Sequence, residues 1–325
     1  MKTMRKHSPG FALALAGTAW LAGSLLLPSA AAAAAPPAPA PKSFATPKQA
    51  ADALIAAAAK NDVAALLAIL GPDGKPLVDS GDPVDDRNGR ARFVEKAREK
   101  TIIEYDMADP SVAFVVVGKD EWPAPIPIVQ SNGKWTFDAK SGSREVLARR
   151  IGGNELDAIA LLRGYVDAQE EYATVQHDGS GMLQYAQRAI STPGKQDGLC
   201  WKNADGRWGG PMGDVIAAGV AEGYTKKTEP FNGYYFRILT AQGASARKGA
   251  RSYVVNGAMI GGFGMIAWPA NYDVTGIQTF IVNQDGTVYQ KDLGPDTAKL
   301  AAAIQAYDPD KTWAETDDEL DDDAQ

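Results

Sequence analysis

The sequence of 325 residues predicts an α+β protein in which helices pack against antiparallel sheets. Between residues 249 and 295, four short runs rich in Val, Ile, Phe, Tyr and Trp are separated by Gly, Pro, Asn and Asp, which is typical of antiparallel strands joined by hairpins. Upstream, residues 44–140 begin with helical patterns and continue with period-two alternation. Residues 155–176 place apolar side chains along one stripe of a long helix. The length is enough for two domains of this class.

The first predicted domain covers residues 44–150. Thr46, Pro47 and Gln49 form a capping-box pattern that opens a helix, and Asn132-Gly133 is a strong hairpin signal. The order of helices followed by a curved sheet resembles the cone-shaped fold of nuclear transport factor 2 in topology. Helices are expected at about 47–59, 63–70 and 87–100, the last after a turn-rich segment at 81–86, and strands at about 103–107, 112–116, 126–130 and 134–138.

The second predicted domain covers residues 151–314. A short linking helix at 144–151 precedes it, and Asn154 is expected to cap the long helix at 155–176. Residues 177–230 are Gly-rich and predicted to be irregular. Strands are expected at about 234–240, 252–255, 263–268, 277–282 and 288–291, and a last helix at about 296–306.

Both termini are predicted to lie outside the folded domains. Residues 1–35 have a basic start, an apolar run and small residues at the end, which is typical of a cleaved signal peptide. An Ala/Pro linker follows at 36–43, and residues 315–325 carry seven acidic and no basic side chains, which indicates a disordered tail. The expected location is periplasmic or secreted. We expect no stable membrane anchor after cleavage.

The charge balance argues against binding to nucleic acid. The formal net charge is −7, and removal of the three basic residues of the signal peptide takes it to −10. An acidic exported protein is a poor match for polyanions or anionic membrane surfaces.

Two side chains are candidates for catalysis. His177 is the only histidine outside the signal peptide, and Cys200 is the only cysteine of the chain. An imidazole can activate a thiol, so this pair could form a catalytic dyad, whereas a lone cysteine is more often a small buried apolar residue. One His and one Cys do not complete a usual zinc site, and the sequence has no Gly-x-Ser-x-Gly nucleophile motif.

Two acidic segments are weak candidates for calcium binding. Asp82 opens a segment with the spacing of a calcium loop, but its twelfth position is Phe93 where a bidentate Glu is needed. Asp285 precedes Gly286 between two predicted strands, where Asp-Gly more simply indicates a hairpin turn. We therefore predict capped turns at both places, and no cofactor.

Aromatic side chains are dense in the second domain and several lie in predicted loops. Exposed aromatic rings beside a sheet would suit the binding of a sugar or a peptide. The alternative is that they fill the core or hold loops in place. The candidates for ligand binding are Trp201, Trp208, Tyr224, Trp268 and Tyr272.

Several phrases of the sequence resemble a bacterial family catalogued as a domain of unknown function (DUF2950). The resemblance covers about residues 44–313 and implies an exported protein of a Gram-negative bacterium, without assigning catalytic residues. The phrases are FRILTAQG at 236–243, RSYVV at 251–255, GFGMIAWPA at 262–270, TGIQTFIVNQDG at 275–286 and KDLGPD at 291–296.

The second domain is also similar to the globular part of type IV pilins and pseudopilins. The likeness rests on the helix that ends in DAQEEY at 167–172, the Gly-rich loop after it, and the strand pattern at 275–288. In pilins a helical spine packs on an antiparallel sheet and begins as an apolar helix, whereas here the helix follows a soluble domain. The resemblance therefore implies a binding or scaffolding domain more than a filament subunit.

Together these observations predict an exported envelope protein that binds or scaffolds a partner protein or a surface glycan without catalysis. The alternative is a periplasmic hydrolase that uses His177 with Cys200 or a nearby carboxylate.

Overall fold

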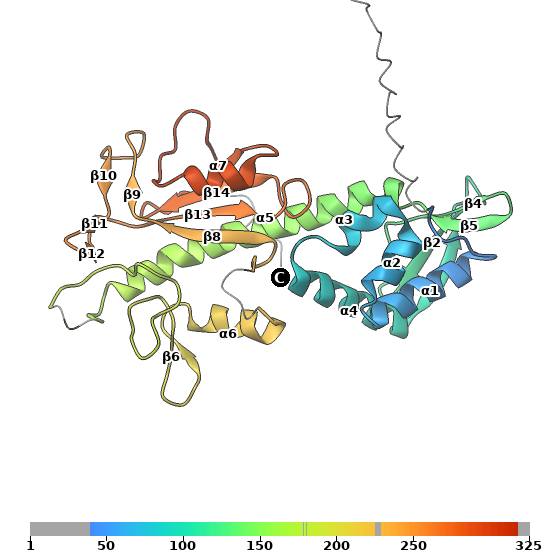
Figure 1. The fold of residues 1–325 in the computed structure, drawn as a ribbon, viewed down its shortest axis with the longest axis horizontal. Coiled ribbons are helices and arrows are strands. Elements are labelled where there is room, and N and C mark those ends of the chain that lie inside the picture. Colours follow the sequence, from blue (N-terminus) through green and yellow to red (C-terminus); the bar gives the residue numbers. More distant parts are fainter. Residues whose placement is uncertain (1–39, 178, 180, 225–228, 318–325) are drawn as a thin grey trace, which may run out of the picture. The chain divides into compact units, whose positions relative to one another are not determined.

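The computed structural model describes residues 40–177, 179, 181–224 and 229–317. The predicted signal peptide, most of the linker and most of the acidic tail lie outside the described residues. Among the described helices, none is both long enough and apolar enough to cross a membrane. Antiparallel sheets carry packed helices, which confirms the predicted α+β class (Figure 1).

The first helices begin where their capping residues predict. Thr46 Oγ1 accepts a hydrogen bond from the Gln49 N–H at 3.2 Å, and Asp62 Oδ1 accepts one from the Ala65 N–H at 2.9 Å. Each bond satisfies a backbone donor that has no partner inside its helix. The helical elements of this region are α1 (Pro47–Ala59), α2 (Val63–Leu70), the 3₁₀ turn η1 (Pro72–Gly74), α3 (Lys75–Val78) and α4 (Pro83–Glu99).

Helix α4 begins earlier than the sequence suggested. The segment 81–86 was expected to be a turn before a helix at 87, but its last four residues form the first turn of α4. Asp82 Oδ1 accepts hydrogen bonds from the Val84 N–H at 3.1 Å and the Asp85 N–H at 3.0 Å. Pro83 occupies the first helical position, where its missing N–H costs nothing. The acidic cluster is therefore a helix start.

A five-stranded antiparallel sheet packs against these helices. Its order is β1-β2-β4-β5, with β3 also paired to β2. Asn132 and Gly133 both have positive φ, 51° and 72°, in the hairpin between β4 and β5, as the Asn-Gly signal predicts. The strands are β1 (Thr101–Tyr105), β2 (Val112–Val117), β3 (Trp122–Pro123), β4 (Ile128–Ser131) and β5 (Lys134–Phe137).

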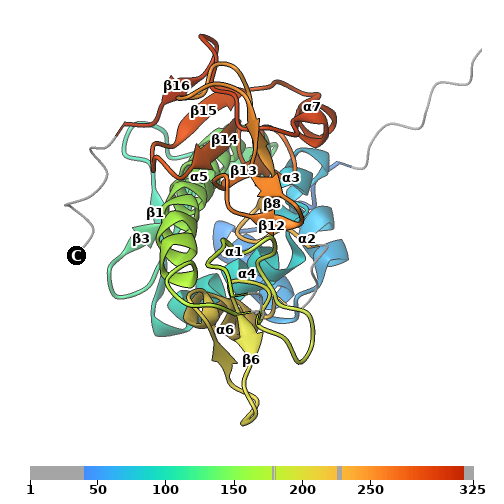
Figure 2. The ribbon, with the colours of Figure 1, turned by 90° about the vertical axis from the view of Figure 1, so that its left-hand side faces the viewer.

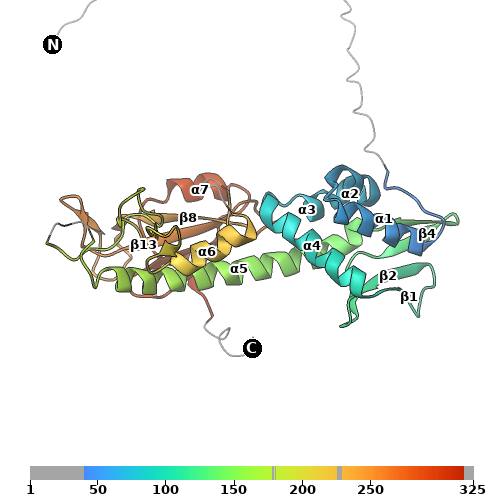
Figure 3. The same cartoon turned by 90° about the horizontal axis from the view of Figure 1, so that it is seen from below.

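One helix of 34 residues, α5 (Ala139–Tyr172), replaces the two helices predicted at 144–151 and 155–176. Gly152 and Gly153 stay helical, and Asn154 does not cap a new helix; its Nδ2 donates to the Thr275 carbonyl at 2.9 Å. Helix propensity is a weak preference that tertiary packing overrides. In Figure 3, α5 runs past α3 and α4 and continues under β13 and β8.

The central strands of the second sheet, β13 and β14, are buried on both faces. Its order is β16-β15-β14-β13-β8, with all neighbours antiparallel. Phe280 and Val282 pack toward α5, whereas Ile281 packs in the cluster that includes Ala301 of α7 (Figures 1 and 2). The elements are β8 (Tyr234–Leu239), β13 (Gly264–Pro269), β14 (Gln278–Asn283), β15 (Tyr289–Asp292), β16 (Ala314–Glu315) and α7 (Thr297–Ala303). Glu315, placed by the sequence in the acidic tail, is thus part of a strand.

The described residues of the segment predicted to be irregular, 177–230, contain one helix. This is α6 (Gly213–Glu222), which ends at Gly223 in the left-handed conformation with φ 113°. Its length of ten residues, with Gly213 at its start and Gly219 inside it, gives a weak helical signal in the sequence. The remaining strands are short pairs: β6 (Trp201–Lys202), β7 (Trp208–Gly209), β9 (Ala241–Gln242), β10 (Arg251–Ser252), β11 (Val254–Val255) and β12 (Ala258–Met259).

The buried carboxylate of Asp82 joins α4 to the second half of the chain. Its Oδ2 accepts hydrogen bonds from Tyr224 Oη and from the Gly233 N–H, both at 3.0 Å. Asp82 is 1% exposed. Ser80 Oγ accepts from the Asp82 N–H, and Asn271 Nδ2 donates to the Ser80 carbonyl. Partners 142 to 191 residues away in the sequence therefore complete the start of α4.

Replacing Gly142 or Gly152 of α5 by alanine should have opposite effects on stability. A Cβ on Gly142 would lie 2.6 Å from the Ile126 Cα and 2.8 Å from the Pro125 carbonyl oxygen, whereas a Cβ on Gly152 would meet no described atom within 4 Å. Gly142→Ala should therefore destabilise the protein by about 1–3 kcal/mol. Gly152→Ala should stabilise it by about 0.5–1 kcal/mol, because a helical glycine costs backbone entropy. Chemical denaturation measures both, and equal effects would contradict this packing of α5.

The hydrogen bonds that Asp82 accepts from Tyr224 and Gly233, which we call the Asp82 junction, predict that the Tyr224 hydroxyl contributes to stability. Tyr224→Phe removes a hydrogen bond to a buried carboxylate and should cost about 1–3 kcal/mol in unfolding free energy. The matched control is Tyr272→Phe, which removes an exposed hydrogen bond of 3.2 Å to Asp292 and should change stability by less than about 0.5 kcal/mol. Urea unfolding of both variants compares them, and equal costs would argue against the junction.

Candidate functional site

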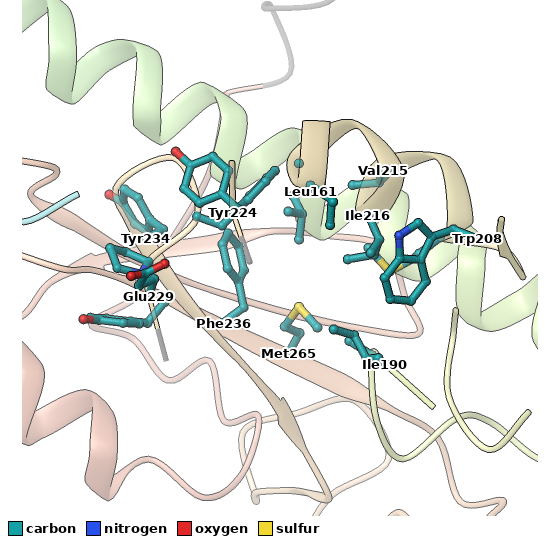
Figure 4. Close-up of a pocket in the computed structure, with 17 residues that line it drawn as sticks. Leu161, Ile190, Trp208, Val215, Ile216, Tyr224, Glu229, Tyr234, Phe236 and Met265 are labelled. Atoms are coloured by element: carbon teal, nitrogen blue, oxygen red, sulfur yellow. The ribbon is translucent and has the colours of Figure 1, made fainter. Parts of the chain in front are cut away.

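An aromatic pocket of about 360 Å³ lies between α5, α6, β8 and β13. We call it the aromatic pocket from here on. In Figure 4, Val215 and Ile216 of α6 face Met265 of β13, with Trp208 at one end and Tyr224 at the other. Its lining residues are Leu161, Ala189, Ile190, Trp208, Met212, Val215, Ile216, Gly219, Val220, Tyr224, Glu229, Pro230, Phe231, Tyr234, Tyr235, Phe236 and Met265.

Gly219 allows helix α6 to pack closely against Phe231, and the helix thereby forms one wall of the pocket. A Cβ on Gly219 would lie 2.7 Å from Cε2 of the Phe231 ring, so a larger residue would push this ring away. The Phe231 ring in turn packs on Tyr224, with centroids 4.8 Å apart. On the solvent side, Val215 and Val220 remain 43% and 40% exposed. The pocket thus has fixed aromatic walls and an apolar rim that is open to solvent.

The hydroxyl groups of Tyr224 and Tyr234, two of the three tyrosines that line the pocket, are already engaged. Tyr234 Oη donates to the Gln278 carbonyl at 2.9 Å, and Tyr224 Oη donates to Asp82. Burial raises the pKa of both phenols, and the Asp82 carboxylate raises that of Tyr224 further, so both stay protonated donors. They hold the pocket together and have little capacity left for a ligand.

One buried donor in the pocket is unused. The indole N–H of Trp208 is buried and finds no acceptor among the described residues. A buried donor without a partner carries a desolvation penalty that an incoming acceptor would relieve. The other face of the indole is covered by Lys202, whose Nζ lies 4.1 Å from the ring centroid. The indole N–H is thus a polar group of the pocket wall that the described residues leave without a partner.

The five aromatic candidates from the sequence do not form one site. Trp208 and Tyr224 line the pocket. Trp201 lies instead beside His177, with ring centroids 5.5 Å apart, and Trp268 packs on Tyr235 in β8. Tyr272 bonds to Asp292 at the surface. Phe231, Phe236 and Met265 were not predicted from the sequence as pocket residues. The signal that could have led to them is the apolar face of residues 213–222, because this helix lines the same pocket.

His177 and Cys200 lie in the region beside Trp201. The His177 ring stacks on Tyr172 with centroids 4.0 Å apart, and its Nε2 lies 3.1 Å from the Tyr172 carbonyl oxygen. Cys200 is 0% exposed, and its backbone pairs with Ala189. His177 is half-buried, whereas Cys200 is fully buried. Their joint action as a catalytic pair stays a prediction.

The calcium candidates have other partners. Asp82 caps α4, as described above. Asp285 lies in the turn after β14, where its carboxylate pairs with the Arg247 guanidinium, which lowers the pKa of Asp285. Within the described residues, no group of three or more His, Cys, Asp or Glu side chains is arranged to hold a metal ion. Calcium binding at either aspartate stays the alternative to the predicted turns.

The turn at Asp285 and Gly286 supplies a test of this interpretation. Gly286 has φ 83° and a Cβ there would meet no described atom, so strain alone should make Gly286→Val cost about 1–3 kcal/mol. Asp285→Asn should cost less than about 1 kcal/mol, because the pair with Arg247 is exposed on the arginine side. Thermal melts with calcium and with chelator compare them. A calcium-dependent rise in Tm that Asp285→Asn abolishes would identify a metal site.

The comparisons with known proteins identify a family but no activity. Neither the curated proteins nor the solved structures gave a match to this chain. A family model described as "Protein of unknown function (DUF2950)" matches residues 41–316, which include both sheets, α5 and the aromatic pocket. By this match the chain belongs to the DUF2950 family.

Proposed function

We propose that this chain is an exported, non-enzymatic binding protein whose aromatic pocket takes an apolar side chain of a partner polypeptide. The observation that carries the proposal is the pocket itself, with aromatic walls, an exposed apolar rim and an orphaned indole donor. Ligand sites in proteins are typically concave and apolar, with a few placed polar groups. Export is supported by the signal-like residues 1–35.

The chemistry of the pocket favours a polypeptide over a glycan. A sugar brings many hydroxyls, and each one buried without a hydrogen bond costs free energy. Tyr224 and Tyr234 have their hydroxyls engaged elsewhere, so they offer sugars little more than ring faces. A peptide needs fewer hydrogen bonds from the pocket than a sugar does. Its apolar side chain fills the pocket, and one backbone carbonyl can accept a hydrogen bond from the Trp208 indole. This match of few donors to few acceptors supports a peptide ligand.

Two exposed valines provide a variant and its matched control. Val215 lies at the rim of the pocket and Val255 lies in β11 outside it, and each is 43% exposed. We expect peptides selected from a random display library on the processed protein to carry a large apolar side chain. Val215→Glu should weaken their binding about tenfold or more, because a charge would replace an apolar contact at the rim. Val255→Glu should leave it unchanged.

The same two variants separate the competing interpretations. Selected peptides that bind equally to both variants would contradict the pocket as the binding site. If glycans from an array bind the processed protein and this binding is lost in Val215→Glu, the ligand of the pocket is a sugar and not a peptide. Circular dichroism of each variant checks that the fold is retained.

A further inference from the structure

A second cavity, of about 530 Å³, lies in the first half of the chain and shares no residue with the aromatic pocket. It is enclosed by α1 to α4, the first sheet and the first half of α5, and we call it the amphipathic cavity. Its inner wall is apolar. The apolar lining residues are Leu54, Ala58, Leu66, Leu70, Leu77, Val78, Phe93, Trp122, Ala124, Pro125, Ile126, Phe137 and Val146.

The inner wall remains partly open to solvent. Leu54, Phe93, Trp122 and Ile126 are half-buried, although each packs against the core of the first domain. Protein interiors are ordinarily close-packed with few voids larger than a water molecule. A space of this size beneath apolar side chains is therefore a binding cavity more than a packing defect, and its contents should be apolar.

The mouth of the cavity carries more positive than negative charge. Four arginines line it against three aspartates. Arg90 donates to the Val78 carbonyl at 2.8 Å, and Arg150 donates to the Pro76 carbonyl at 2.6 Å. Neither of these two arginines has a carboxylate within 4.0 Å in the described part of the chain. Carbonyl oxygens position the two guanidinium groups without neutralising their charge.

The other two arginines keep donors free at the surface. Arg92 reaches Asp85 at 3.3 Å, and Arg149 uses its Nε for Glu145 at 2.8 Å. A guanidinium has five N–H donors, so each retains several. The Arg149 guanidinium lies 6.0 Å from the centre of the Trp122 ring, at the border between the charged mouth and the apolar wall.

The aspartates at the mouth are held by hydrogen bonds within the protein. Asp86 accepts a hydrogen bond from the Ser80 N–H at 2.9 Å, and Asp157 accepts one from Asn232 Nδ2 at 3.0 Å. Burial raises the pKa of both carboxyl groups, while the charges of Arg150 and Arg90 act in the opposite direction on Asp86. Asp85 is paired with Arg92. Four arginines against three aspartates leave the lining of the mouth with an excess of one positive charge.

A glycine of α5 leaves the entrance open. Gly153 lines the cavity, and a Cβ there would meet no described atom within 4 Å. At Gly142 a side chain would clash with neighbouring atoms, whereas at Gly153 it would not. A glycine inside a helix also makes the helix less stable than an alanine does, so packing does not explain Gly153. Its effect is to leave space where a side chain would narrow the mouth.

We propose that the amphipathic cavity binds a single-chain amphiphile with an anionic head, such as a fatty carboxylate. The tail lies among the apolar side chains of the inner wall, and the head accepts hydrogen bonds from the arginines at the mouth. Planar guanidinium groups match the two oxygens of a carboxylate. This site is separate from the aromatic pocket, so the two proposals stand or fall independently.

The first experiment tests the chemistry of the ligand. Calorimetric titration of the processed protein uses monomeric dodecanoate and dodecyltrimethylammonium, which share the same tail and carry opposite heads. We expect dodecanoate to bind at least about tenfold more tightly, because only the anion bonds to the arginines. Equal affinities, or no binding of dodecanoate, would overturn the proposal. Sedimentation with phosphatidylglycerol vesicles distinguishes a membrane surface, since binding to vesicles without binding of the monomer would also overturn it.

The second experiment places the site with matched variants. Gly153→Leu should narrow the mouth and weaken dodecanoate binding about tenfold, whereas Gly152→Leu, one residue earlier and outside the cavity, should not change it. Arg149→Ala should weaken binding about fivefold, and Arg144→Ala on the same helix should not. Thermal melts confirm that each variant is folded. Binding that is indifferent to both Gly153→Leu and Arg149→Ala would place the ligand elsewhere and overturn the proposal.

Discussion

The buried carboxylate of Asp82 is the constraint on which both candidate sites depend. A buried charge is costly unless hydrogen bonds compensate it, and Asp82 accepts four: two from the first turn of α4, one from Tyr224 and one from the Gly233 backbone. Tyr224 lines the aromatic pocket, and the first turn of α4 carries Asp85 and Asp86 to the mouth of the amphipathic cavity. One side chain therefore fixes a wall of each site.

Helix α5 provides the second connection between the sites. Its first half contributes Arg149 and Arg150 to the mouth of the amphipathic cavity, and its second half contributes Leu161 to the aromatic pocket. Because the helix continues through Gly152 and Gly153, the two halves are joined by backbone hydrogen bonds and not by a loop. A change in the direction of α5 would alter both cavities. The domain boundary near residue 150 stays a prediction, and it falls inside this helix.

Local signals in the sequence predicted the parts of the fold that local chemistry determines. Thr46 capped its helix and Asn132-Gly133 formed its hairpin, because each signal acts within a few residues. The start of α4 and the continuity of α5 were misjudged, since Asp82 and Asn154 have partners more than 100 residues away. The cavities could not be predicted for the same reason. The identity of an aromatic residue does not reveal which face of its strand or loop it will occupy, so only Trp208 and Tyr224 were identified as pocket residues.

The hydrogen-bonding capacity that the fold leaves unused determines which ligand each cavity suits. In the aromatic pocket the phenol groups of Tyr224 and Tyr234 are bonded to Asp82 and Gln278, whereas the buried indole N–H of Trp208 has no partner among the described residues. Such a site can select an apolar group beside one carbonyl, but it cannot compensate a buried charge. At the mouth of the amphipathic cavity, Arg149 keeps guanidinium donors at the edge of an apolar wall, where partial desolvation strengthens a charge-assisted bond. The fold therefore offers an uncharged side chain one site and an anionic head the other, and a ligand suited to one should be rejected by the other.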